Sequence, residues 1–329
     1  MPGVVSDADA RLGRRVTFRD LQILFSVVQL GSMAKAAAHL AVTQPTVSQA
    51  IADLEDAVGV RLLDRSPQGV TPTAYGEVFL KRGLEAFDAL RQGMRDIERL
   101  ATPGAGDIWI GSAETWLGGF VPTVIRHLAE SHPKVVIHAA HANASDFDFQ
   151  ALRERKLDLM IGRILNSQVD DEMNVEVLFE EPHRVVVAAH SPWARRRRVT
   201  LAELRDERWI FSERSNIVTS LVSEAFRANG LELPGAKVVT TSMILHLPLL
   251  ASGDYITTLP YSILRYCIER WSLRVLPIDL GIKSPVGIFT LKQRTLNPIV
   301  QLFLEAARAE AKLLQQEIAQ WGVSANRFG

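Results

Sequence analysis

Short hydroxyl and amide side chains are concentrated in one stretch of this 329-residue sequence. The stretch holds Thr43, Gln44, Thr46, Ser48 and Gln49. Side chains of this kind exchange hydrogen bonds with base edges and phosphate oxygens, and a helix that carries them without bulk can enter the major groove of DNA. Backbone amides at the N-terminus of such a helix can also bind a phosphate. The stretch therefore predicts the recognition helix of a DNA-binding domain.

The predicted helices around this stretch follow one another as in a helix-turn-helix. Apolar residues at helical spacing predict a first helix from Phe18, and Ser32 is a suitable N-cap for a second, alanine-rich helix. Thr43 can cap a third helix that runs to about Val58, and Pro45 in its first turn lacks only an N–H that the helix does not use. An apolar stripe along the third helix must pack inward, so its polar face is expected to point outward.

A hairpin signal follows this third helix. Residues 61–73, RLLDRSPQGVTPT, read as two short extended pieces around a turn, which predicts a wing. Arg61 and Arg65 of the wing, together with Lys35 of the second helix, are the cations best suited to contact phosphates. The predicted DNA-binding residues are Ser32, Lys35, Thr43, Gln44, Pro45, Thr46, Ser48, Gln49, Arg61 and Arg65.

A long helix that Thr73 can cap is predicted after the wing, over residues 73–101. It carries an apolar seam spaced by threes and fours, and a seam on a solitary helix needs a partner. The seam comprises Leu80, Leu84, Phe87, Leu90, Met94 and Ile97. The glycine- and proline-containing residues 102–106 then predict a hinge. The sequence thus favours a winged helix-turn-helix over 16–72, a linker helix whose apolar seam needs a partner, and a separate domain beyond the hinge.

The rest of the chain, 107–329, alternates between strand and helix patterns. A helix is expected from about Leu117 to Ser131, and separate extended segments are expected at 175–181, 183–190, 273–278 and 285–292. Alternation of this kind is typical of an α/β domain with a largely parallel sheet. Two α/β units are expected, the first formed by about 107–180 and 283–329, and the second by about 181–282. Residues 1–15 show no periodicity and are expected to form a disordered tail.

Composition limits the function classes. Apolar residues make up 47% and charged residues 22% of the chain, which is typical of globular proteins. Lys+Arg and Asp+Glu both number 37, so DNA binding would need a local basic surface rather than a global excess. The single cysteine, Cys267, excludes an internal disulfide. We expect no cofactor, metal site or catalytic group, because no HExxH, GxSxG or glycine-rich phosphate loop is present. No signal peptide or membrane span is expected, which favours the cytoplasm.

The stretch GSMAKAAAHLAVTQPTVSQAIADLEDAVGVRLLDRSPQGVTPTAYG closely resembles the LysR-type transcriptional regulators, and the resemblance extends over the chain after the tail. The resemblance implies a DNA-binding regulator of promoter DNA, an effector domain of the periplasmic-binding-protein type, and assembly into dimers or tetramers. Two positions depart from the family pattern. Gln49 stands where Arg is common and Ala34 stands where Ser or Thr is frequent, so the resemblance does not give the operator sequence.

The resemblance also places a small-molecule effector between the two α/β units. The residues that match by position are Ser112, Glu114, Thr115, Asn143, Ser145, Arg163, Ser212, Ser215 and Ser242. Hydroxyls, helix N-termini and Arg163 suit a carboxylate. Glu114 and Trp116 would instead suit a cationic or sugar-like ligand, so the effector class stays open. Each of these residues could also be an ordinary cap or loop residue.

Two further functions remain as alternatives at this point. One is a solute-binding module without gene control, and the other is an α/β enzyme. The first lacks an export signal, and neither explains residues 32–76. A run of arginines at 195–198 is expected to be a solvated loop rather than a nucleic-acid patch.

Overall fold

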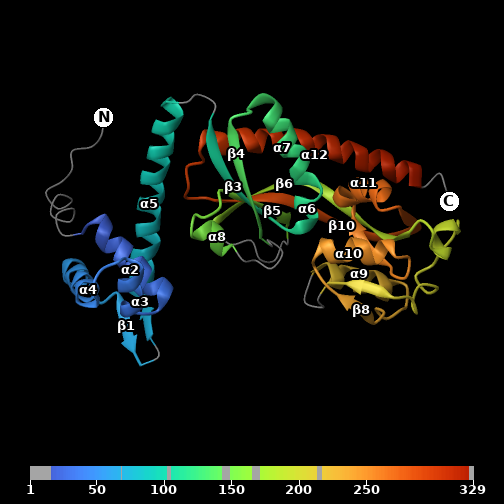
Figure 1. Cartoon of the computed structure of the whole chain (residues 1–329). Helices are drawn as coiled ribbons and strands as arrows, with labels where there is room; N and C mark the ends of the chain where they lie inside the picture. The colour runs from blue at the N-terminus through green and yellow to red at the C-terminus, as the bar shows by residue number, and fades with distance from the viewer. Residues whose placement is uncertain are drawn as a thin grey trace. The chain divides into compact units, whose positions relative to one another are not determined.

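The computed structural model describes residues 16–67, 69–101, 105–142, 149–164, 171–212 and 217–325. Two compact units divide the chain, Met1–Ile97 and Glu98–Gly329. Each is described here by itself (Figure 1). The predicted tail and most of the predicted hinge lie outside the described residues.

The N-terminal unit has the predicted order of helices and strands. It contains α2 (Phe18–Leu30), α3 (Met33–His39), α4 (Gln44–Val58), β1 (Leu63–Ser66), β2 (Gly69–Pro72) and α5 (Ala74–Ala101). The predicted cap residues Ser32, Thr43 and Thr73 each accept a hydrogen bond from the backbone N–H three residues further on, so these three predictions are confirmed. Strands β1 and β2 pair antiparallel and form the wing.

A small core holds this unit together. Val47, Ile51 and Leu54 of α4 are fully or almost fully buried against Leu24 and Val27 of α2. The predicted apolar stripe therefore packs inward, which leaves the opposite face of α4 at the surface.

The first turn of α5 approaches the wing closely. A Cβ at Gly76 would collide with the backbone carbonyl of Leu62, so only glycine allows this approach.

The C-terminal unit is an α/β domain. In chain order it contains β3 (Gly106–Ser112), α6 (Glu114–Leu117), α7 (Phe120–Ser131), β4 (Val135–His141), α8 (Gln150–Arg153), β5 (Leu159–Arg163), β6 (Met173–Ala188), the 3₁₀ turn η2 (Pro192–Arg195), β7 (Trp209–Phe211), α9 (Ile217–Ala228), β8 (Ala236–Val239), α10 (Met243–Ala251), β9 (Thr257–Pro260), α11 (Tyr261–Arg270), β10 (Leu273–Leu291) and α12 (Pro298–Ala325). Its main sheet has the strand order β4-β3-β5-β10-β6-β9, and β7 pairs with β8 beside it.

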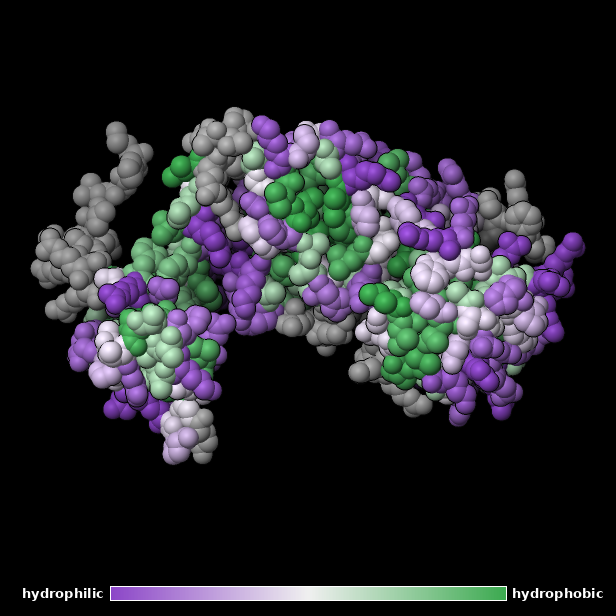
Figure 2. Space-filling view, viewed as in Figure 1, coloured by the Kyte–Doolittle hydropathy of each residue, from purple (hydrophilic) through white to green (hydrophobic). Residues whose placement is uncertain are grey.

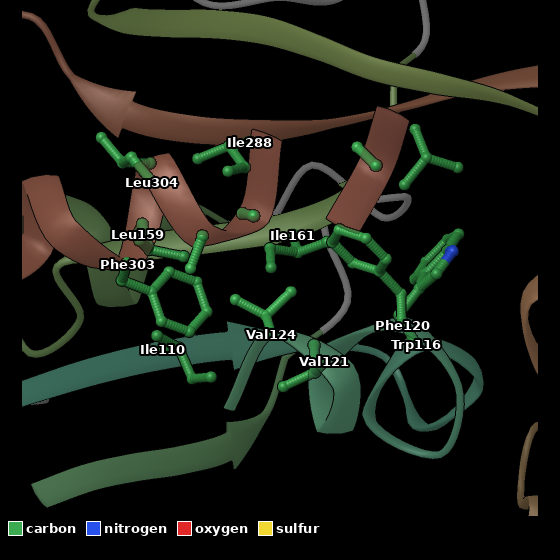
Figure 3. Packing of buried hydrophobic residues seen from close by; sticks show 14 of the residues in the cluster. Ile110, Trp116, Phe120, Val121, Val124, Leu159, Ile161, Ile288, Phe303 and Leu304 are labelled. Atoms are coloured by element: carbon green, nitrogen blue, oxygen red, sulfur yellow. The ribbon is translucent and has the colours of Figure 1, made fainter. Parts of the chain in front are cut away.

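The two largest hydrophobic cores of this unit mark its two halves, which we call the first and the second subdomain. The first core lies between the sheet and helices α7 and α12, where Phe303 of α12 lies close to Ile110 and Leu159 of the sheet (Figure 3). The second core is built around Trp209, which packs against Phe226 at 5.6 Å between ring centroids. Strands β6 and β10 run through both halves, so the same two strands contribute to both cores.

The structure corrects the strand prediction in two ways. The pieces that the sequence suggested as separate strands, around 175–181 and 183–190, form the single strand β6, and the pieces before and after Gly281 form the single strand β10. The sheet is also mixed rather than largely parallel, because β10 pairs antiparallel with both β5 and β6. Pro182 does not break β6, because its partner in the ladder is Lys283 and the register shifts on either side absorb the irregularity.

Helix α11 was not predicted, and the helix predicted from about Leu117 is divided into α6 and α7 at Gly118 and Gly119. No single helix within the described residues is long and apolar enough to cross a membrane. Helices α2 and α3 reach that threshold only as a pair, and they are bent by 120° at their junction.

Candidate nucleic-acid interface and effector region

The polar face of α4 lies at the surface of the N-terminal unit. Thr43, Gln44, Pro45, Thr46 and Gln49 are exposed, and Ser48 is half-buried. The predicted cations Lys35, Arg61 and Arg65 are exposed as well, whereas Ser32 is half-buried and caps α3. The polar side chains predicted to contact DNA are therefore accessible on this unit.

Hydrogen bonds within α4 order part of this face. The hydroxyls of Thr43 and Thr46 lie 2.8 Å apart, and the Thr43 hydroxyl also accepts from the backbone N–H of Thr46. One turn further on, Nε2 of Gln49 donates to Oδ1 of Asp53 at 2.8 Å. Since the first turn of a helix has backbone N–H groups without intrahelical partners, the same end of α4 can also receive an anion.

Glu55 fixes the wing relative to α4, and the sequence reasoning did not single it out. Its Oε1 accepts from the backbone N–H groups of Leu62 at 2.7 Å and Leu63 at 3.1 Å. Thr73 adds a second tie, because its hydroxyl donates to the carbonyl of Arg61. The segment that carries Arg61 is thus attached to both α4 and α5. No local sequence signal points to Glu55, because its partners are backbone N–H groups.

The predicted effector residues of the first subdomain have different surroundings. Ser112 is buried, and its hydroxyl donates to the carbonyl of Ile161 at 2.8 Å, so it ties β3 to β5. Thr115 is half-buried. Glu114, also half-buried, accepts a hydrogen bond at Oε2 from the backbone N–H of Met243, the first residue of α10. The carboxylate of Glu114 therefore bridges the two subdomains.

The predicted residues of the second subdomain lie at a helix start and at a strand end. Ser242 occupies the N-cap position of α10 but its side chain makes no capping hydrogen bond, and Glu114 satisfies the first N–H of that helix instead. Ser212 is half-buried, and its carbonyl accepts from the hydroxyl of Thr219 in α9. Three other predicted effector residues lie outside the described residues, namely Asn143, Ser145 and Ser215.

Arg163 lies at the end of β5 in a buried polar cluster. Its Nε donates to Oγ of Ser284 at 2.8 Å, its Nη2 donates to Nε2 of His183 at 2.9 Å, and its guanidinium lies 5.5 Å from the centroid of the Trp116 ring. Burial lowers the pKa of Arg163 to about 10, and the nearby Glu181 carboxylate opposes that shift. Arg163 is thus a buried cation that the chain itself surrounds with partners.

Glu181 and His183 complete the cluster from β6. Burial raises the pKa of Glu181, while its oxygens accept from the backbone N–H of Ser262 at 2.7 Å and from Nε1 of Trp116 at 3.1 Å. Burial and the neighbouring Arg163 hold the pKa of His183 well below its usual range. Because a guanidinium can only donate, Nε2 of His183 is the acceptor, and the imidazole is neutral with its proton on Nδ1.

Sequence reasoning found Arg163 but not its partners. Glu181 and His183 lie in the charged stretch EEPHR, and Ser284 lies between Lys283 and Pro285, so no local pattern marked these three residues as buried. The cluster joins the ends of β5 and α6 to both long strands, so it lies where the two subdomains meet.

Cys267 does not suit thiolate chemistry. The side chain is buried, and burial raises its pKa to about 11. No group of His, Cys, Asp and Glu residues that could hold a metal ion occurs within the described part of the chain.

Comparison with known proteins decides the family. Residues 18–77 match the model of the bacterial regulatory helix-turn-helix protein, lysR family, and residues 101–312 match the model of the LysR substrate binding domain. The chain belongs to the LysR family of transcriptional regulators. Its N-terminal unit is the DNA-binding domain of this LysR-type regulator, and its C-terminal unit is the effector-binding domain.

Curated LysR-type relatives match almost the whole chain. The regulator GbpR of Azospirillum brasilense is 29% identical over 301 residues, which cover 91% of this chain and 87% of GbpR. The regulator PcaQ of Agrobacterium fabrum is 28% identical over 300 residues, which cover 91% of this chain and 96% of PcaQ. These relatives are transcriptional regulators rather than enzymes, so the enzyme alternative and the solute-binding module without gene control are both set aside.

Solved structures share the fold, among them that of CbnR, a LysR family transcriptional regulator. Full-length BenM is 26% identical with a TM-score of 0.51, over 89% of this chain and 96% of BenM. CbnR in complex with its target DNA is 22% identical with a TM-score of 0.63, over 90% of this chain and all of that chain. The two-part architecture predicted from the sequence, a helix-turn-helix followed by an α/β effector domain, is confirmed.

Proposed function

We propose that this LysR-type regulator binds double-stranded promoter DNA through the polar N-terminal face of α4, with the wing and Lys35 contacting phosphates. The observation that carries the proposal is that Thr43, Gln44, Thr46 and Gln49 are exposed together on the face of α4 opposite its buried stripe. A helix with small polar side chains at its N-terminal end suits the major groove. In this proposal the DNA-binding domain is formed by residues 16–72 and the linker helix by residues 73–101. The hinge is formed by residues 102–106, and the effector domain is formed by residues 107–329.

The chain is proposed to act as a dimer or tetramer in the cytoplasm. Helix α5 supports self-association, because it exposes apolar side chains along its length: Tyr75, Val78, Leu90, Met94 and Ile97 are between 51% and 68% exposed. Part of this apolar surface is visible over α5 in Figure 2. Exposed apolar surface of this kind is typical of an interface, and two paired helices would place two recognition helices on one duplex. A Met94→Glu substitution is expected to dissociate the oligomer in analytical ultracentrifugation, whereas Ala89→Lys, at an exposed position of the same helix, is expected to affect it less.

The effector is proposed to bind where the two subdomains meet. Glu114, Thr115, Ser212 and Ser242 support this, because each lies at a strand end or helix start and is half-buried rather than fully packed. Arg163 would contribute a positive charge that the nearby Glu181 carboxylate partly balances. A small carboxylate remains the proposed class, although it would have to compete with the Glu114 carboxylate at the start of α10.

Binding to selected DNA tests the proposal. Duplexes are enriched from a random pool with the purified full-length chain, and affinity is then measured by fluorescence anisotropy at several salt concentrations. We expect log affinity to fall linearly with log salt, by about 0.9 for each phosphate contact. Arg65→Ala should weaken binding to every duplex and reduce the slope by about one.

The matched control is Arg197→Ala. It removes an exposed arginine of the C-terminal unit, so affinity and slope should stay as in the wild type. Failure to enrich any sequence, with binding that does not distinguish duplexes, would contradict the proposal.

A further inference from the structure

A hydrogen bond links two exposed side chains on the face of α4 proposed to enter the groove. Nε2 of Gln49 donates to Oδ1 of Asp53 at 2.8 Å, one helical turn further along. Both residues are exposed, because the buried stripe of Val47, Ile51 and Leu54 occupies the other side of the helix. The pair therefore lies on the surface, with Gln49 nearer the N-terminal end of α4.

The chemistry of the two groups fixes which end of the amide faces Asp53. An ionised carboxylate only accepts hydrogen bonds, whereas an amide has a donating nitrogen and an accepting oxygen. The reverse orientation would bring the amide oxygen against the carboxylate oxygen. The carboxylate of Asp53 thus holds Nε2 of Gln49 on its own side and keeps Oε1 on the opposite side of the amide.

An amide held in this way discriminates among bases. In the major groove adenine offers the N6 amino donor beside the N7 acceptor, cytosine offers the N4 amino donor, and guanine offers only the acceptors O6 and N7. Oε1 of Gln49 can accept from an exocyclic amino group, and the second hydrogen on Nε2 can donate to N7. Adenine satisfies both groups, whereas guanine would place O6 against Oε1.

We propose that Asp53 is a positioning residue for base specificity, which orients the amide of Gln49 so that it reads adenine in preference to guanine. This inference rests on the proposed function, in which Gln49 contacts a base. Asp53 itself touches no base in this scheme. It acts only by limiting rotation of the Gln49 amide.

The experiment measures base preference at one position of the selected duplex. With the full-length chain, Gln49→Ala identifies the base pair whose preference it removes, and four duplexes that differ only at that pair are then compared. We expect the wild type to favour adenine over guanine at least tenfold. Asp53→Ala, which removes the acceptor, should reduce that ratio at least threefold.

Two variants separate the hydrogen bond from the charge. Asp56→Ala removes an exposed carboxylate of the same helix one turn from the hydrogen-bonded pair, so it should change overall affinity as Asp53→Ala does while the adenine preference stays as in the wild type. Asp53→Asn retains an oxygen that accepts from Nε2 without the charge, so it should preserve most of the preference. Circular dichroism melting checks that every variant is folded.

The outcomes distinguish this inference from the proposed function. If the wild type enriches no sequence, the proposed function fails. If the wild type binds specifically but Gln49→Ala alters no base preference, or Asp53→Ala leaves the adenine-to-guanine ratio unchanged, the role of Asp53 is overturned while DNA binding stands. If Asp53→Asn loses as much of the adenine preference as Asp53→Ala does, the effect is due to the charge of Asp53. That result would also overturn the positioning role of Asp53.

Discussion

The carboxylate of Glu114 accepts the backbone N–H of Met243, and this contact joins the first subdomain to the first residue of α10 in the second. A carboxylate at a helix N-terminus satisfies a backbone donor that has no intrahelical partner and interacts favourably with the helix dipole. Glu114 thereby supplies the cap that Ser242 does not provide. If the two subdomains move apart at this point, the hydrogen bond between Glu114 and Met243 has to break.

Removing the Glu114 carboxylate should therefore loosen the start of α10. We expect Glu114→Ala to cost roughly 1–2 kcal/mol of stability, the range for loss of a charged cap. The amide hydrogen of Met243 should exchange faster with solvent, as measured by hydrogen–deuterium exchange of the peptide that contains it. Glu130→Ala, which removes an exposed carboxylate of α7, should leave that exchange unchanged. Equal exchange in Glu114→Ala and the wild type would contradict the capping role.

A buried ion pair in the first subdomain should be far more sensitive than a surface pair. Arg294 and Asp158 lie 2.7 Å apart with side chains only 3% and 5% exposed, and Asp158 also accepts the backbone N–H of Trp109. Removing one charge leaves the other buried without compensation, so Asp158→Asn is expected to cost about 3–5 kcal/mol. Urea unfolding measures this cost. Asp206→Asn at the exposed pair with Arg205 should change stability by less than about 0.5 kcal/mol.

Stability should fall on the acid side because His246 is buried in its neutral form. Burial lowers its pKa to about 4, and Nε2 donates to Thr257, whose own hydroxyl hydrogen is used by the Ile210 carbonyl. The folded pKa lies below the unfolded one, so the unfolded chain binds more protons between pH 6.5 and 4. The stability that neutral His246 contributes is complete above about pH 6.5 and is lost as the pH falls from about 6.5 to 4.

Replacing His246 tests this directly. We expect His246→Asn to lose less stability than the wild type between about pH 7.5 and pH 5, as measured by urea unfolding at both values. His141→Asn, at an exposed position at the end of β4, should show the same pH dependence as the wild type. An identical acid-side loss in His246→Asn and the wild type would show that His246 does not contribute.

Cys267 should be protected from thiol reagents in the folded chain. A pKa of about 11 leaves roughly one hundredth of the thiolate that an unshifted thiol has near pH 8, and burial limits access further. We expect iodoacetamide to alkylate Cys267 at least about a hundredfold faster after unfolding in urea, as followed by mass spectrometry. Comparable rates in the folded and unfolded chains would contradict the burial of this side chain.

Local sequence signals predicted the N-terminal unit well. The caps Ser32, Thr43 and Thr73 act over three residues, and the apolar stripe of α4 lies within four turns, so both are visible in the sequence. Glu55 was missed because its partners are the backbone amides of Leu62 and Leu63, and backbone groups leave no mark in a sequence pattern.

Long-range pairing was harder to predict. Arg163 and Ser284 are separated by 121 residues, and only the antiparallel register of β5 with β10 brings them together. Proline and glycine suggested breaks in β6 and β10, yet the ladder continues through Pro182 and past Gly281. A strand in the middle of a sheet gains pairing from both sides, and this tertiary gain outweighs the local preference.

The chain passes between its two α/β halves along β6 and β10, which are hydrogen-bonded to each other for most of their length. The connection is therefore a two-stranded antiparallel ribbon rather than a flexible loop. Bending it would distribute strain over many hydrogen bonds between the two strands. The register shifts on both sides of Asp279 interrupt the regular pairing of β6 with β10, so we expect the two strands to bend most easily there. Substitutions there are expected to change how readily the two halves move relative to each other, even though none of those side chains needs to touch a ligand.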